Sequence, residues 1–168
     1  LHYPLRRQRQ MCIRDSAIFM AQRLMQQNEL DGWKLRFDER KTSLGRCNEY
    51  SKTIYLSLPY VELNKESVIK DVVLHEIAHA LAGCENHHNI IWRTFARKIG
   101  AKPERCAGQD TIRPESKFKL VCNNCKWERP AHRRTKKKRA CPKCCNEHNN
   151  GYYSEEYRLE YERTRKII

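Results

Sequence analysis

The pentapeptide His75-Glu76-Ile77-Ala78-His79 constrains this chain more than any other feature. In an α-helix, residues four positions apart lie on the same face, so both imidazoles can bind one metal ion. Glu76 would then lie beside that ion, where a carboxylate can accept a proton from an attacking water. The pattern therefore predicts a helical zinc site of the kind that hydrolyses peptide bonds.

The residues around this pentapeptide are almost all apolar, from Val68 to Ala82. A helix that is apolar all round is buried, and buried histidines and carboxylates need partners, which a metal would supply. The alternative, two surface histidines and a solvated glutamate, does not fit this setting. Asn64 is the expected N-cap of the helix, and Gly83 suits the position just after its end.

A catalytic zinc usually has three protein ligands and one open position. A second helix is expected at 86–99, ended by Gly100. On that helix His88 falls near the centre of the apolar stripe, beside Trp92, whereas His87 points sideways. We therefore expect a catalytic zinc on His75, His79 and His88, with Glu76 as general base and His87 solvated or in a supporting role.

Two Cys-x-x-Cys pairs, separated by 15 residues, lie nearer the C-terminus. This spacing is typical of a zinc bound by four thiolates, and four sulfurs leave no position open for water. The second zinc is therefore expected to be structural, in a small zinc ribbon at 117–164. The predicted ligands are Cys122, Cys125, Cys141 and Cys144.

Either of the adjacent residues Cys144 and Cys145 could be the fourth sulfur ligand, although the two-residue spacing favours Cys144. His132 and His148 are weaker alternatives.

Positive charge gathers in the same region. The chain has a net charge of +14, and residues 113–168 hold 16 basic and 7 acidic residues, whereas residues 17–112 are nearly balanced. Clustered positive charge indicates a nucleic-acid partner, the alternative being a merely solubilising surface. The charge alone is compatible with DNA, RNA or an acidic protein, and stacking of Trp127, Tyr152 or Tyr153 on bases would suit a single strand, including single-stranded DNA. The expected phosphate contacts are Arg133, Arg134, Lys136, Lys137, Lys138 and Arg139.

The fold class expected from these patterns is α+β. A helix at 17–29 and strands at 33–38, 44–50 and 53–58 precede the metal-site helix. Residues 1–16 show neither the periodicity of a helix nor that of a strand, and they resemble translated sequencing adapter. We therefore expect a non-native or disordered segment there. Residues 17–110 then form the catalytic domain, and 111–116 form a linker to the ribbon.

The stretch His75 to Leu81, followed by His88 and Trp92, resembles the SprT-like zinc metalloprotease family. That family includes the Spartan proteases, which digest proteins crosslinked to DNA. Residues 45–47 and 53–57 resemble the strand pair that precedes the active-site helix, and 99–106 resembles the bacterial and phage branch. Asn89 departs from the family, since many members have Gly there.

The resemblance implies a zincin-like domain in which a small sheet packs on the active-site helix. It also implies a zinc endopeptidase acting on DNA-associated or DNA-crosslinked proteins, tethered to DNA by the ribbon. The alternative is a non-catalytic zinc-containing protein with a nucleic-acid-binding or regulatory role, although such a protein does not need a carboxylate, Glu76, beside the metal. A metal-dependent hydrolase of a non-peptide bond is a third hypothesis.

The sequence also carries an expectation about location. No stretch has the roughly 18 apolar residues that a membrane span needs. Residues 17–25 are interrupted by Gln22 and Arg23, so no signal peptide is expected there. A soluble, cytoplasmic protein is therefore predicted, associated with the nucleoid or nucleus when bound to DNA. No oligomeric state is predicted.

Overall fold

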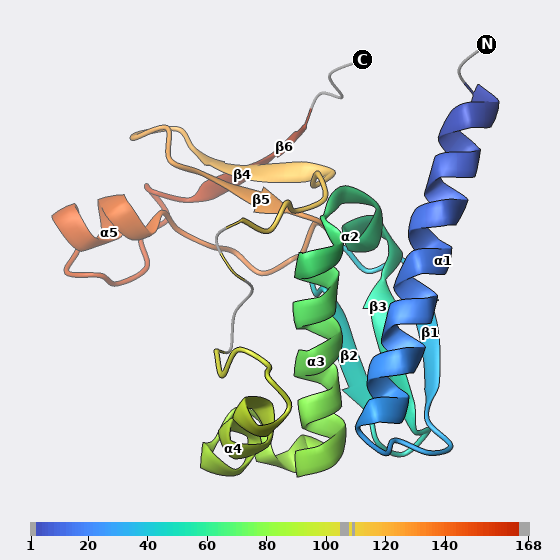
Figure 1. The fold of residues 1–168 in the computed structure, drawn as a ribbon. Coiled ribbons are helices and arrows are strands. Elements are labelled where there is room, and N and C mark those ends of the chain that lie inside the picture. Colours follow the sequence, from blue (N-terminus) through green and yellow to red (C-terminus); the bar gives the residue numbers. More distant parts are fainter. Residues whose placement is uncertain (1–2, 105–107, 109, 165–168) are drawn as a thin grey trace. The chain divides into compact units, whose positions relative to one another are not determined.

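The computed structural model describes residues 3–104, 108 and 110–164. Two compact units make up the chain, Leu1–Pro114 and Glu115–Ile168, and each is described by itself. Both units contain a small sheet and at least one helix, so the fold is mixed α+β as expected (Figure 1).

Unit 1 contains a three-stranded sheet of β1 (Lys34–Asp38), β2 (Gly45–Asn48) and β3 (Thr53–Ser57). Their order is β1-β3-β2, with β1 parallel and β2 antiparallel to β3. The three strands match the expected ones to within a few residues. Because β3 is central, the outer edge of β2 pairs with no other described strand, and we call it the free edge of β2.

Two long helices, α1 (Tyr3–Gln27) and α3 (Glu66–Ala82), pack against each other and against this sheet (Figure 1). Their shared contact is the main apolar core, which the alternating side chains of β3 complete. Burying this surface is what holds the metal-site helix on the sheet. The buried members of this core are Ala17, Ala21, Met25, Leu30, Ile54, Leu56, Val61, Ile69, Val73 and Ile77.

Helix α1 begins much earlier than residue 17, where it was expected. No Gly or Pro occurs between residues 5 and 27, so nothing in this stretch breaks the helix. Ile13 packs on the core, and the Arg14 guanidinium lies 5.1 Å from the centre of the Phe37 ring. That residues 1–16 are non-native stays a prediction. In the described part of the chain, no helix has both the length and the apolar character to cross a membrane.

The start of α3 differs from the expectation. A short helix, α2 (Leu58–Leu63), follows β3 directly and has Pro59 in its first turn, where proline is tolerated. The N-cap of α3 is Lys65, not Asn64. The Asn64 side chain instead pairs with the backbone of Ile112, since Nδ2 donates to Ile112 O and Ile112 N donates to Oδ1, each at 2.8 Å.

The segment after α3 is also more broken than one helix at 86–99. A single 3₁₀ turn, η1 (Cys84–Asn86), is followed by α4 (Ile90–Lys98). The Asn89 side chain caps α4 by accepting from Ile91 N at 2.9 Å and Trp92 N at 3.2 Å. The family departure at Asn89 thus supplies a cap, and His88 lies in the loop before the helix.

Unit 2 is built on an antiparallel sheet in the order β5-β4-β6. Its elements are β4 (Phe118–Cys122), β5 (Glu128–Ala131), α5 (Pro142–His148) and β6 (Leu159–Arg163). The buried cluster consists of two leucines and three cysteines, namely Leu120, Cys122, Cys141, Cys144 and Leu159. Such a small apolar cluster indicates that the sulfurs contribute to stability by more than packing.

Candidate functional site

Three imidazoles meet in unit 1. His75 and His79 come from successive turns of α3, and His88 reaches them from the loop before α4. His88 Nε2 lies 3.0 Å from His75 Nε2 and 3.2 Å from His79 Nε2. Ligand nitrogens on a tetrahedral zinc lie about 3.3 Å apart, since each bond is about 2.0–2.1 Å. The three nitrogens therefore fit one zinc ion.

His75 and His79 are also in the protonation state that a metal requires. Burial, followed by the neighbouring imidazoles, lowers the pKa of His75 to about 4. Burial and His88 likewise lower the pKa of His79 to about 4. Both rings are therefore neutral at pH 7 with a lone pair free to bind a metal.

Trp92 supports all three rings. It is fully buried, and its ring centre lies 4.8 Å from that of His75, 5.3 Å from His79 and 4.6 Å from His88. Because Asn89 caps the helix that carries Trp92, the cap fixes this contact as well as the helix end. His87, by contrast, is exposed, has a φ of 45° and lies outside the three-histidine group.

Glu76 is buried beside these rings, with 6% of its surface exposed. Burial raises its pKa to about 8, against a lowering by the hydrogen bond from the backbone N–H of Cys47. That bond ties the carboxyl to strand β2. A carboxyl with this pKa can both accept and donate a proton near neutral pH.

Gly45 permits the close approach of β2 to α3. A Cβ at this position would lie 2.9 Å from Glu76 Oε1 and 3.0 Å from Val72 Cγ1, which is too close. Any larger residue would push the carboxyl or the strand aside. The sequence pattern marked Gly45 only as part of a family resemblance and gave no reason for it.

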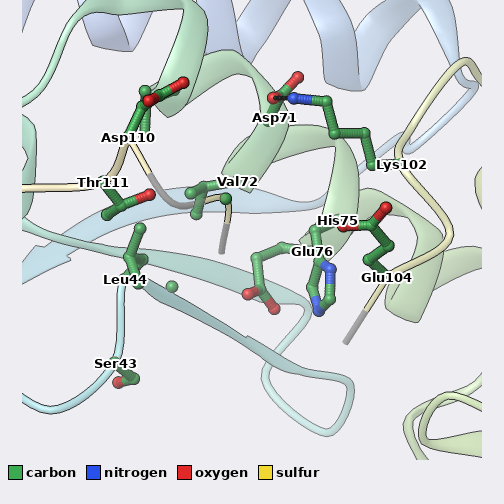
Figure 2. Close-up of a pocket in the computed structure, with 13 residues that line it drawn as sticks. Ser43, Leu44, Asp71, Val72, His75, Glu76, Lys102, Glu104, Asp110 and Thr111 are labelled. Atoms are coloured by element: carbon green, nitrogen blue, oxygen red, sulfur yellow. Dashed lines mark hydrogen bonds and ion pairs between the residues drawn. The ribbon is translucent and has the colours of Figure 1, made fainter. Parts of the chain in front are cut away.

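A cavity of about 290 Å³ opens beside Glu76 and His75 (Figure 2). One wall is a single face of α3, another is the segment 43–45 that leads into β2, and the third is the segment after α4, including Lys102 and Thr111. Sequence reasoning missed this cavity because the third wall has no periodic pattern. Arg105 and Cys106, part of the family-like stretch 99–106, lie outside the described residues.

The four predicted sulfur ligands of unit 2 also come together. Cys122 Sγ lies 3.8 Å from Cys144 Sγ, and Cys125 Sγ lies 3.5 Å from Cys141 Sγ. All four sulfurs are within 4.8 Å of one another. Cys145 is buried but lies outside this group, as do His132 and His148.

Backbone N–H groups point at two of these sulfurs in the same way. Cys122 Sγ accepts from Asn124 and Cys125, and Cys141 Sγ accepts from Lys143 and Cys144. At Cys122 burial opposes ionisation, but the N–H donors outweigh it and lower the pKa to about 7. Donors of this kind stabilise thiolates, which is the form that binds zinc.

At Cys144 and Cys141, burial has the largest effect on the thiol pKa. It raises the pKa of Cys144 to about 12, and it raises the pKa of Cys141 despite its N–H donors. Such buried thiols ionise readily only beside a cation. The donor set therefore fits a structural zinc ion.

All six predicted phosphate contacts, residues 133, 134 and 136–139, are exposed in one loop of unit 2. Lys138 is partly neutralised by Glu155 at 3.3 Å, and Arg134 stacks over Phe118 at 5.0 Å. Of the aromatic residues considered for base stacking, Trp127 packs against the ribbon core, whereas Tyr152 and Tyr153 are exposed.

A model of the SprT-like family matches residues 15–113, more than half of the chain. The chain belongs to the SprT-like family. The match includes the sheet, α3, the three histidines and Glu76, and it ends before the ribbon. Searches of curated proteins and of solved structures gave no match. SprT-like membership, together with the three-histidine group, indicates a metallopeptidase-related protein.

The buried carboxyl of this SprT-like protein generates a pH prediction for the metal-free chain. Between pH 4.5 and about 8, folded Glu76 keeps a proton that the unfolded chain releases, so its contribution to stability falls as pH rises. Glu76→Gln lacks this titration. Both proteins are unfolded in urea after a chelator has removed the metal. Across this pH range, the free energy of unfolding of the wild type should fall by a few kcal/mol more than that of the variant, on the order of 1.4 kcal/mol per pKa unit.

The histidines titrate in the opposite direction but are common to both proteins, so the comparison isolates Glu76. A difference in stability that does not change with pH would contradict the assigned burial.

Proposed function

We propose that the protein is a zinc-dependent endopeptidase of the zincin type that hydrolyses DNA-associated or DNA-crosslinked proteins. The observation that carries the proposal is the convergence of three imidazoles beside one buried carboxyl. Three ligands leave a fourth coordination position open, as catalytic zinc sites require.

A zinc ion on His75, His79 and His88 would polarise the scissile carbonyl and lower the pKa of the attacking water. Glu76 accepts the proton of that water and passes it to the leaving amine. The positive charge of the ion would draw the pKa of Glu76 below the value of about 8 that burial alone sets. The Cys47 N–H holds the carboxyl in position for both transfers.

The free edge of β2 suits an extended substrate. Ser57 N donates to Leu44 O at 2.8 Å, and antiparallel alternation then turns the backbone groups of Gly45 and Cys47 away from β3. Cys47 N–H is taken by Glu76, so Gly45 offers the donor and acceptor nearest the site. A substrate strand that pairs there would pass beside Glu76.

The ribbon supplies the second half of the proposal. Six exposed cations in one loop attract phosphates, and the affinity of such contacts falls steeply with salt. We infer that the ribbon holds the enzyme on DNA, so that substrates are chosen by proximity. The exposed Tyr152 and Tyr153 could stack on unpaired bases.

Proteolysis of a DNA-binding protein, with and without single-stranded DNA, tests the peptidase. Wild type should cleave faster with DNA, and Glu76→Gln should lose cleavage by at least about a hundredfold, the scale of a missing general base. The variant should retain zinc, measured by elemental analysis. Equal results from the two proteins, with DNA binding retained, would favour the non-catalytic binding protein instead.

Removing charge from the loop tests the DNA tether separately. Neutralising four of its cations should weaken DNA binding and flatten its salt dependence, by about 0.7–0.9 in slope for each lost phosphate contact. An equal loss of charge from exposed positions of unit 1 is the matched control and should change the slope little. The loop variant carries Gln at Lys136, Lys137, Lys138 and Arg139, and the control at Lys34, Arg36, Lys70 and Arg97.

Fluorescence anisotropy at several salt concentrations measures both slopes. An unchanged slope in the loop variant would remove the loop from the interface.

A further inference from the structure

We propose that the cavity beside Glu76 is a specificity pocket for a cationic substrate side chain, lysine or arginine, next to the scissile bond. The inference rests on the proposed peptidase function and deepens it by naming the residue that the site selects.

The cavity lies beside the groups proposed to carry out the reaction. Glu76 and His75 line one end of the cavity, so a side chain that enters it belongs to a residue near the reacting bond (Figure 2). At about 290 Å³ the cavity is at the small end of ligand pockets. It suits one long side chain rather than a folded segment.

The lining of the cavity is partly apolar and partly acidic. Leu44, Val68 and Val72 offer an apolar surface, whereas Asp71, Glu104 and Asp110 bring carboxylates to the same cavity. Lysine and arginine combine an aliphatic stem with a charged end, and such side chains bury the stem while the charge stays near water. An apolar wall with acidic groups is complementary to that shape and charge.

The acidic side chains that line the cavity outnumber the basic ones. Lys102 Nζ lies 2.6 Å from Asp71 Oδ2, and this pair neutralises one carboxylate. Glu104 and Asp110 also attract Lys102, although more weakly, and together the three carboxylates raise its pKa. Among the described residues that line the cavity, Asp71, Glu104 and Asp110 therefore bring two more negative charges than Lys102 offsets, in a chain whose net charge is +14. Lys102 itself illustrates how these carboxylates hold an ammonium group.

Described residues that flank Glu104 and Asp110 in the chain are tied to the rest of unit 1. Ala101 N donates to Ala96 O at 2.8 Å, and Ile112 shares a pair of hydrogen bonds with the Asn64 side chain. Lys102 adds its ion pair to α3. Proteins that bind DNA carry lysine and arginine at their contacts, so this preference suits the proposed substrates.

Three synthetic peptides that differ at one position, lysine, norleucine or glutamate, test the pocket. Binding is measured by anisotropy on the full chain carrying His79→Ala, which removes a metal ligand outside the cavity lining and prevents cleavage. The lysine peptide should bind about fivefold or more tightly than norleucine, as expected for two partly exposed charge pairs, and glutamate should bind least. Norleucine binding as tightly as lysine would overturn the pocket.

Two variants in the same background locate the effect. Glu104→Gln with Asp110→Asn should abolish the preference for lysine, whereas Asp31→Asn with Glu39→Gln, an equal charge change at exposed positions outside the cavity, should keep it. A preference that survives the first variant would overturn the assignment. The comparison among peptides needs no pocket variant, so it stands even if that variant fails to fold.

Cleavage of the same peptides by the wild-type chain separates the pocket from the peptidase. Faster cleavage of the lysine peptide, by a similar factor in kcat/KM, supports both. Preferred binding of lysine with no cleavage of any peptide would overturn the peptidase and support the pocket. Equal cleavage of all three peptides would overturn the pocket and leave the peptidase standing.

Discussion

Unit 1 depends on one constraint, the burial of a carboxyl and the partial burial of two imidazoles in a helix that otherwise forms core. Glu76 is 6% exposed, and its pKa of about 8 measures how poorly the site accommodates a lone negative charge. The low pKa values of His75 and His79 show the same for positive charge. Groups buried in this way need a partner that satisfies all of them, and a metal ion does so. The neighbouring features, the Gly45 approach, the Trp92 contact and the Asn89 cap, shape that one site.

The two candidate metal sites differ in ligand type. Three histidines would leave a coordination position open on a zinc ion and place a carboxyl beside it, so this site suits chemistry. Four cysteines would close the coordination shell, and in unit 2 a zinc ion bound by them would take the place of the apolar core that so short a segment cannot build. Backbone N–H groups aimed at Cys122 and Cys141 prepare the sulfurs for a cation. The ribbon can therefore present its charged loop without a large core beneath it.

The sequence was sufficient wherever spacing alone determines geometry. The pair His75 and His79, the strands of unit 1 and the grouping of four sulfurs all follow from local periodicity. His88 lies with His75 and His79, but the helix from which it was predicted does not include it, because Asn89 caps α4 and the helix begins only at Ile90. Asn64 pairs with distant Ile112 instead of capping α3. The acidic cavity joins three segments far apart in the sequence, so no local pattern could have revealed it.

His88 is proposed to complete a zinc site with His75 and His79. The most direct test compares variants of two adjacent histidines. The zinc content per chain is measured by elemental analysis after exhaustive dialysis. His88→Ala should lower the zinc content from two ions to one, because the four-cysteine site is retained. His87→Ala, the matched control, should keep two. Two zinc ions retained by His88→Ala, or one lost from His87→Ala, would contradict the account.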